Sequence, residues 1–320
     1  MSIEGLHVVI LSGGISHERD VSLRSGRRVA DALSRAGADV TIREPDASLL
    51  GFLEEAKPDV VWPLLHGSSG ENGALYSLLR AGRIPYVGSR PTSARLAWNK
   101  ATAKALAKRA GLSTPPSIVL ENSTFRELGA EAVMRLIARG IELPAVVKPV
   151  EGGSAQGVSS VSTFEELPQA LVTAFTYDDT VIIEKRVEGR EVMVGVLDLD
   201  GEPLALPAVE VVANKGVYDY EARYNAGETT YYAPARLSDD EAARVNEAAL
   251  HAVATIGLSD IARVDFIVDE AGVVWFLEAD PIPGLTETSI VPLGIEADDS
   301  ELSTIYAQLA AAAAARGPLE

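Results

Sequence analysis

Short apolar runs alternate with longer amphipathic stretches along the first third of the chain. The β-rich runs predict strands at 7–11, 39–43 and 60–65, and the stretches between and after them predict helices at 21–36, 47–56 and 74–81. Strands that alternate with helices are typical of a parallel sheet covered by helices. We therefore expect an N-terminal α/β domain.

The remainder of the chain has a different pattern. A strand at 145–148 leads into the glycine-rich segment 151–157, and beyond residue 191 the strands become longer and hairpin-like, with helices expected at 239–256 and 301–315. This pattern predicts α+β structure. We expect three domains: residues 1–95 as the α/β domain, residues 96–187 as a small central domain, and residues 188–320 as the C-terminal domain.

Composition narrows the class of protein. The 320 residues are 47% hydrophobic and 23% charged, which is ordinary for a globular enzyme, and there is no cysteine to form a disulfide or a thiolate site. No apolar run reaches the about 20 residues that span a bilayer, and no secretory signal is evident, so we expect a cytoplasmic protein. The net charge of −18 argues against nucleic acid or an anionic membrane as partner.

An acidic hairpin near residue 270 carries the strongest chemical signal. Apolar runs at 261–268 and 273–277 flank a predicted turn, and they carry Asp265, Glu278 and Asp280 with Arg263 nearby. Carboxylates on facing strands are unfavourable unless a cation neutralises them, and Mg²⁺ is a natural candidate because it prefers oxygen ligands. The alternative is that Glu278 and Asp280 merely flank a surface turn.

Two further segments suggest a nucleotide site. Lys148 ends an apolar strand just before the glycine-rich segment, whose backbone N–H groups could approach phosphate oxygens, although a plain turn is the simpler interpretation of the glycines alone. The segment lacks the Gly-Lys-Ser/Thr ending of a Walker loop. Glu184 and Lys185 end another strand. Their charges could serve solubility at a sheet edge, or the glutamate could hydrogen-bond an adenine amino group.

These motifs, in this order, resemble the ATP-grasp superfamily and, more closely, the D-alanine–D-alanine ligase family. The resemblance covers essentially the whole chain and extends to four further segments: 11–22, 66–73, the Tyr-rich segment 218–224, and 283–289. It implies an ATP-grasp architecture, with the N-terminal parallel-sheet α/β domain followed by two α+β domains that hold ATP between them. It also implies a homodimer.

The family reaction joins two D-alanines. ATP phosphorylates the carboxylate of the first, and the amine of the second attacks the acyl phosphate, giving D-alanyl-D-alanine for peptidoglycan synthesis, ADP and phosphate. The resemblance implies two Mg²⁺ ions, with Mn²⁺ as an alternative. Such chemistry depends mainly on positioning and charge neutralisation.

The resemblance also assigns roles to residues of this chain. Lys100 and Lys148 would contact phosphates, and Asp265, Glu278 and Asp280 would bind the metal ions. Arg223 would supply a charge from the Tyr-rich segment 218–224, which resembles the family's mobile loop. Adenine and ribose would be held by Glu184, Lys185, Val187 and Glu191. These assignments together make up the expected nucleotide and metal site.

The remaining roles concern the two amino-acid substrates. Glu18 would bind the ammonium of the first substrate, and Ser289 the carboxylate of the second. Arg263 and the Gly284 N–H would stabilise the oxyanion. Glu18, Ser154 and Tyr224 would form a hydrogen-bonded trio that closes the mobile loop over the acyl phosphate. His66 resembles a substrate-pocket residue, although a histidine at a strand end is as often a structural hydrogen-bonding residue.

Several positions depart from the family pattern. Asp280 replaces an asparagine and Arg223 a lysine, and Ile282, Glu287 and Thr288 differ near Ser289. Most of these changes fall at the end that would bind the second substrate, so D-lactate or a non-standard amino acid is an alternative partner. A catalytically inactive nucleotide-binding relative is a second alternative, against which the retained lysines, Arg263 and the three carboxylates argue.

Overall fold

The computed structural model describes residues 3–199, 201–213 and 227–319. Its N-terminal part contains a parallel sheet in the order β2-β1-β3, formed by β1 (His7–Leu11), β2 (Asp39–Arg43) and β3 (Val60–Pro63). The helices here are α1 (Arg19–Arg35), α2 (Leu49–Ala56) and α3 (Ala74–Ala81), with a short 3-10 turn, η1 (Gly67–Ser69). The expected N-terminal α/β arrangement with a parallel sheet is confirmed.

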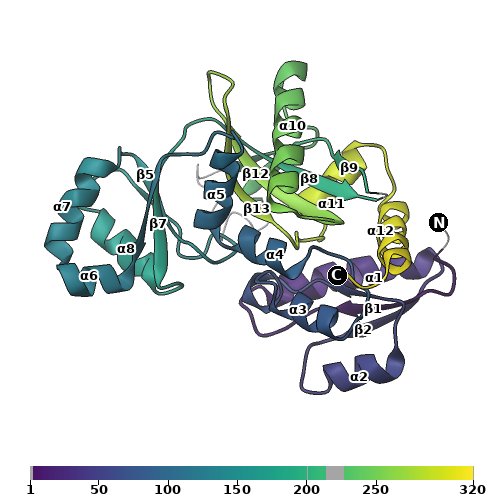
Figure 1. The fold of residues 1–320 in the computed structure, drawn as a ribbon. Helices are drawn as coiled ribbons and strands as arrows, with labels where there is room; N and C mark the ends of the chain where they lie inside the picture. Colours follow the sequence, from purple (N-terminus) through teal and green to yellow (C-terminus); the bar gives the residue numbers. More distant parts are fainter. Residues whose placement is uncertain (1–2, 200, 214–226, 320) are drawn as a thin grey trace.

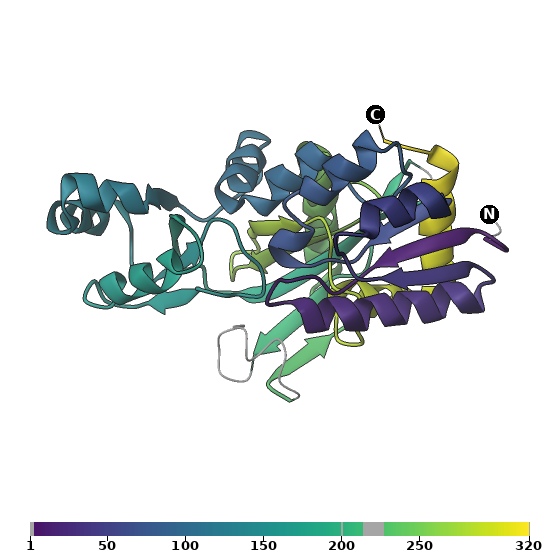
Figure 2. The same ribbon diagram turned by 90° about the horizontal axis from the view of Figure 1, so that it is seen from below.

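The central part contains an antiparallel sheet in the order β4-β7-β5-β6. Its strands are β4 (Ser117–Glu121), β5 (Ala145–Pro149), β6 (Ser159–Val161) and β7 (Thr180–Lys185), and its helices are α6 (Asn122–Leu128), α7 (Ala130–Gly140) and α8 (Leu167–Phe175). One apolar core joins sheet and helices. In both ribbon views this part lies at one end of the molecule (Figure 1, Figure 2).

A third, antiparallel sheet has the order β11-β10-β8-β12-β13, with β9 pairing to β8. Its strands are β8 (Arg190–Asp198), β9 (Pro203–Ala205), β10 (Val209–Ala213), β11 (Thr229–Tyr232), β12 (Ile261–Val268) and β13 (Val274–Asp280). Helix α10 (Asp239–Ile256) begins at a Ser238–Glu241 capping box and ends at Gly257, whose φ of +80° favours glycine.

The remaining described helices belong to none of these three groups. They are α4 (Pro91–Trp98), α5 (Lys100–Arg109), α11 (Ile290–Ala297) and α12 (Leu302–Arg316). Ala103 and Ala107 of α5 share a core with α10 and the third sheet, whereas α12 packs on α1, with Tyr306 edge-on to Trp62. The domain boundaries at residues 95 and 187 stay a prediction. In the structure, α5 packs in the core of the C-terminal part and α12 in the core of the N-terminal part.

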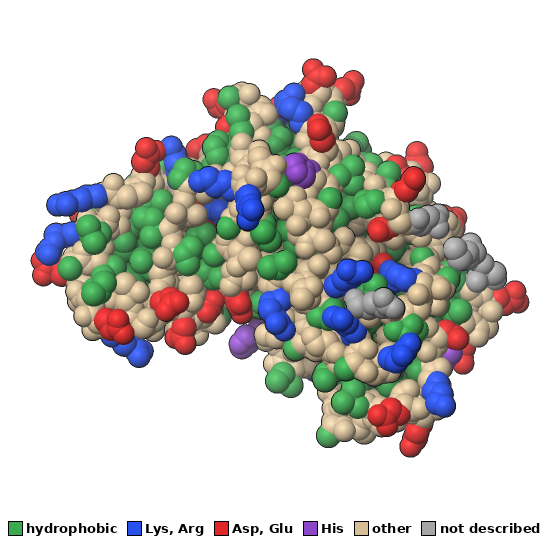
Figure 3. All heavy atoms as spheres, viewed as in Figure 1, with side chains coloured by type: hydrophobic (Ala, Val, Ile, Leu, Met, Phe, Trp, Pro, Cys, Tyr) green, Lys and Arg blue, Asp and Glu red, His purple; other side chains and the backbone are tan. Residues whose placement is uncertain are grey.

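The distribution of charge and the hydropathy of the helices can be followed over the described residues. On the face drawn in Figure 3, acidic side chains are spread over several elements rather than gathered in one patch. Within the described residues, no helix is both long enough and apolar enough to span a membrane.

Candidate active site

Two open cavities meet near the junction of the three parts. The first, about 930 Å³, is lined by residues from the N-terminal loops, the end of β13 and the start of α11. The second, about 1310 Å³, lies between the central and third sheets. Lys100, Gly152, Gly153 and Glu278 line both. A group held in one cavity can therefore lie next to a group held in the other.

The second cavity holds a buried carboxylate between two lysines. Glu184 Oε1 lies 2.6 Å from Lys148 Nζ, and its other oxygen accepts a hydrogen bond from Lys104. Burial alone would raise the pKa of Glu184, but Lys148 and Lys104 lower it below its usual value. Sequence analysis predicted Glu184 and Lys148 and missed Lys104, because a lysine on an Ala- and Lys-rich helix gives no signal of burial.

The other predicted nucleotide-binding residues also line the second cavity. They are Lys100, Lys185, Val187 and Glu191. Lys100 Nζ donates to the Gly152 carbonyl and lies 3.6 Å from Glu278 Oε2. Lys185 Nζ pairs with Glu142 near the surface, 2.5 Å from its Oε2. Arg223 lies outside the described residues.

Strands β12 and β13 bring Arg263 among the three predicted metal ligands. Their register pairs Arg263 with Asp280 and Asp265 with Glu278. The guanidinium donates to Asp265 at 2.7 and 3.1 Å. It forms ion pairs with Asp280, whose Oδ2 lies 2.9 Å from Nη1, and with Glu278, whose Oε1 lies 3.8 Å from Nη2. Burial alone would lower the pKa of Arg263, but Asp265 and Asp280 raise it well above its usual value. The arginine therefore stays charged.

The three carboxylates do not form a ready-made cage. Among the described residues, no group of three or more acidic or histidine side chains is arranged to hold a metal ion. Asp265 and Glu278 face each other and both line the second cavity, whereas Asp280 lines the first. Mg²⁺ commonly takes one or two carboxylates together with nucleotide phosphates, and the pair Asp265–Glu278 fits that donor set.

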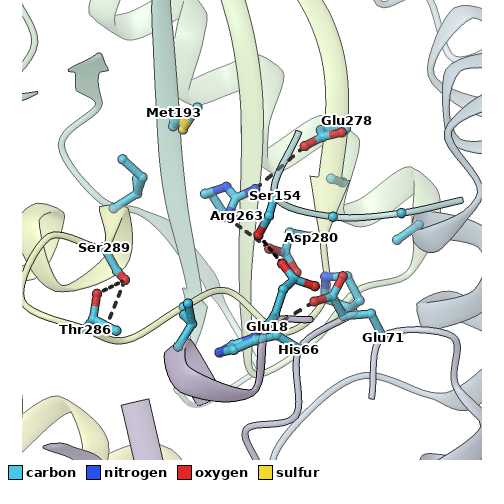
Figure 4. Close-up of a pocket in the computed structure, with 18 of the residues that line it drawn as sticks. Glu18, His66, Glu71, Ser154, Met193, Arg263, Glu278, Asp280, Thr286 and Ser289 are labelled. Carbon is cyan, nitrogen blue, oxygen red and sulfur yellow. Dashed lines mark hydrogen bonds and ion pairs between the residues drawn. The ribbon is translucent and has the colours of Figure 1, made fainter. Parts of the chain in front are cut away.

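A hydrogen bond joins the N-terminal part to the glycine-rich segment. Ser154 Oγ donates to Glu18, at the start of α1, and both line the first cavity (Figure 4). Ser154 has a φ of +51°, and a Cβ on Gly153 would come within 2.9 Å of the Glu18 carboxylate. A side chain at 153 would therefore force the Glu18 carboxylate to shift from this position. Tyr224, the third member of the predicted trio, lies outside the described residues.

His66 and Glu71 form a buried polar pair in the same cavity. His66 Nδ1 lies 3.0 Å from the Ile282 carbonyl and 3.9 Å from Glu71 Oε1, and Glu71 accepts a 2.8 Å hydrogen bond from Gly67 N–H. Burial lowers the pKa of His66; burial, together with Asp280 and Glu18, raises the pKa of Glu71 well above its usual value. Glu71 belongs to the segment 66–73 but was not predicted as a site residue.

The far end of the first cavity contains the predicted second-substrate residues. Ser289 Oγ accepts from Thr286 N–H at 3.0 Å and lies 2.8 Å from Thr286 Oγ1. Gly284 and Thr288 also line the cavity, and a Cβ at 284 would lie 3.0 Å from Ser289 Oγ. Glu287 is exposed and is not among the described residues that line either cavity.

Comparison with known proteins agrees with this arrangement. Residues 106–311 match the family model described as the D-ala D-ala ligase C-terminus. The chain is 42% identical over 289 residues to the D-alanine–D-alanine ligase of Anaeromyxobacter sp., with 90% of each chain covered, and 37% identical over 302 residues to that of Bordetella petrii, with 94% and 89% covered.

Solved structures share the fold. The VanG D-Ala:D-Ser ligase from Enterococcus faecalis matches with a TM-score of 0.83 at 27% identity, covering 97% of this chain and 100% of that one. The D-alanine–D-alanine ligase from Coxiella burnetii matches with a TM-score of 0.81 at 26% identity, covering 98% and 95%. The architecture is that of the ATP-grasp ligases. Within that class, the chain belongs to the D-alanine–D-alanine ligase family.

Proposed function

We propose that this protein joins two D-alanines in an ATP-dependent reaction, giving D-alanyl-D-alanine, ADP and phosphate through an acyl-phosphate intermediate. The observation that carries the proposal is the meeting of the two cavities at Lys100, Gly152, Gly153 and Glu278. ATP held in the second cavity would bring its terminal phosphate next to a carboxylate held in the first. Holding both reactants in line supplies much of the catalysis of such a transfer.

The second cavity provides the groups that a nucleotide needs. Lys148 and Lys100 supply positive charge for the phosphates, and Glu184 with the segment at Lys185, Val187 and Glu191 supplies polar contacts for adenine and ribose. Those two lysines are buried, so their attraction for phosphate is screened little by solvent.

Asp265 and Glu278 would hold the metal ions, two Mg²⁺ with Mn²⁺ as an alternative. The ions would neutralise phosphate charge during transfer. Asp280, the third assigned ligand, forms an ion pair with Arg263 and accepts a hydrogen bond from Ile282 N–H. As a metal ligand it would have to share or release one of these bonds.

The first cavity provides groups for the amino-acid substrates. Glu18 would bind the ammonium of the first D-alanine while Ser154 holds the glutamate in place. Arg263 and Gly284 N–H would stabilise the oxyanion of the tetrahedral intermediate, since both line the cavity. Ser289, from the start of α11, would bind the second carboxylate. His66, whose pKa is lowered by burial, would act as a neutral hydrogen-bonding group.

A different second substrate is the main alternative, because a structural neighbour is a D-Ala:D-Ser ligase. The test incubates the protein with ATP, Mg²⁺ and a mixture of D-alanine, D-serine, D-lactate and other D-amino acids, with products identified by mass spectrometry. We expect D-alanyl-D-alanine to dominate. A mixed product would overturn the assignment of the second substrate, and failure to form ADP would indicate an inactive relative.

The cellular setting follows from the reaction. The dipeptide would serve peptidoglycan synthesis in the cytoplasm, and we propose a homodimer. Sedimentation velocity on the full chain tests the dimer. A single species of monomer mass would contradict it.

A further inference from the structure

One carboxylate and two ammonium groups lie buried together beside the second cavity. Glu184 and Lys104 are each 4% exposed and Lys148 is 7% exposed. Glu184 pairs with both lysines, one on each oxygen. These three groups carry a net charge of +1, which the carboxylates of Glu278 and Asp265 partly offset through their electrostatic effect on Lys148. The cluster is therefore suited to receive an anion.

The two lysines differ in what they can reach. Lys148 lines the second cavity together with Glu184, whereas Lys104 is not among the described residues that do. Lys104 extends from α5, and its Nζ donates both to Glu184 and to the Pro115 carbonyl, 3.1 Å away. Lys104 is thus held behind the carboxylate, and Lys148 is the ammonium that a phosphate can contact.

We propose that Lys104 is a positioning residue for nucleotide binding: it keeps Glu184 neutralised and in place when Lys148 turns from Glu184 to the nucleotide phosphates. The inference rests on the proposed function, which places ATP in this cavity. If Lys104 were absent, Lys148 would be the only cation beside Glu184 in this cluster. Binding a phosphate would then either leave a buried carboxylate unpaired or divide Lys148 between two anions.

The charge of Lys104 in turn depends on Glu184. Burial lowers the pKa of Lys104 below its usual value, while the neighbouring Glu184 carboxylate acts in the opposite direction. The two groups therefore support each other's ionised forms.

The test compares ligands with and without phosphate. Lys104→Met removes the ammonium while keeping much of the side-chain volume, and Lys108→Met makes the same change one turn further along α5, where the lysine is exposed. Dissociation constants for ADP with Mg²⁺ and for adenosine are measured on wild type and both variants, by calorimetry or by competition. Circular dichroism and thermal unfolding confirm that each variant is folded.

We expect Lys104→Met to weaken ADP binding by about tenfold or more. In this variant the buried Glu184 would lose its remaining lysine partner when Lys148 turns to the phosphates. Adenosine binding should change by less than about twofold, since Lys148 can then remain with Glu184. The KM for ATP should rise while that for D-alanine at saturating ATP stays constant. Lys108→Met should behave as wild type.

Equal weakening of ADP and adenosine would indicate a structural role and overturn the proposal, as would unchanged ADP binding. A crystal structure of wild type with ADP tests it without any variant: Lys148 Nζ should lie on a phosphate while Lys104 stays on Glu184. If Lys148 stayed on Glu184 in the ADP complex, the proposal would be wrong. If wild type binds neither ADP nor adenosine, the proposed function itself fails, a result distinct from failure of Lys104 alone.

Discussion

Arg263 forms an ion pair with Asp280, its facing residue on β13, with Nη1 lying 2.9 Å from Oδ2. Asp265, two residues away on β12, accepts from Nε and Nη2 on the other side. Two carboxylates therefore fix the plane of one guanidinium before substrate arrives. A donor that needs no reorganisation is what stabilises an oxyanion effectively.

Asp280→Asn tests whether the charge at this position matters. The ion pair with Arg263 is lost, but the amide oxygen can still accept from Ile282 N–H and Asp265 keeps its two bonds to Arg263, so we expect kcat/KM to fall by less than about tenfold. Steady-state phosphate release measures it. A loss on the order of a hundredfold would mean that the second carboxylate itself is required.

Glu278→Gln should have a much larger effect. Glu278 lines both cavities and lies 3.6 Å from Lys100 Nζ and 3.8 Å from Arg263 Nη2. Removing its charge weakens metal and phosphate bridging, so ATP turnover should be abolished while thermal unfolding stays close to wild type. Near-normal turnover at saturating Mg²⁺ would remove Glu278 from the site.

Ser154→Ala tests the link between the N-terminal part and the glycine-rich segment. Loss of the hydroxyl removes the hydrogen bond to Glu18, so we expect a lower rate and more ATP hydrolysed per dipeptide formed, because the acyl phosphate is less well protected from water. Ser154→Gly is the matched control, since glycine relieves the positive φ but also lacks the hydroxyl. If Ala uncouples the reaction and Gly does not, the hydroxyl is dispensable once the positive φ is relieved, and the hydrogen bond to Glu18 is not what protects the acyl phosphate.

Glu287→Ser should leave both Michaelis constants for D-alanine unchanged. The side chain is exposed and is absent from the described lining of the first cavity, so its charge is screened from the second carboxylate. Initial-rate kinetics over a wide range of D-alanine concentration separate the two constants. A decrease confined to the second constant would show that Glu287 reaches the pocket.

Glu71→Gln should change how stability depends on pH. The folded-state pKa of Glu71 is raised by burial and by Asp280 and Glu18 from a usual value of 4.5. The unfolded state then loses its proton first, so the contribution of Glu71 to the free energy of unfolding is full below pH 4.5 and is lost as pH rises through the folded pKa. Glutamine does not titrate, so the variant should gain stability relative to wild type between pH 5 and pH 8, about 1.4 kcal/mol for each unit of pKa difference removed.

Urea unfolding at several pH values measures this change, with Glu127→Gln, an exposed glutamate on α6, as control. Parallel stability curves for wild type and Glu71→Gln would contradict the raised pKa.

Local patterns were sufficient to predict the acidic hairpin. Residues two apart on a strand point to the same face, so Arg263 with Asp265, and Glu278 with Asp280, had to emerge on one side of β12 and β13 once the turn between them was recognised. The alternation of the first third likewise predicted the parallel sheet. The amphipathic helix α7, with Val133 and Ile137 one turn apart, carries the same kind of signal, although it was not among the predicted elements.

Only the tertiary structure decided which distant groups meet. Glu18 and Ser154 are 136 residues apart, and Lys104 and Glu184 are 80 apart. No local pattern encodes such contacts, because they depend on how separate sheets pack. The exposure of Glu287 likewise depends on its tertiary surroundings. The sequence by itself determined which residue types face which side of each element; burial and packing between elements determined their partners and therefore their charges.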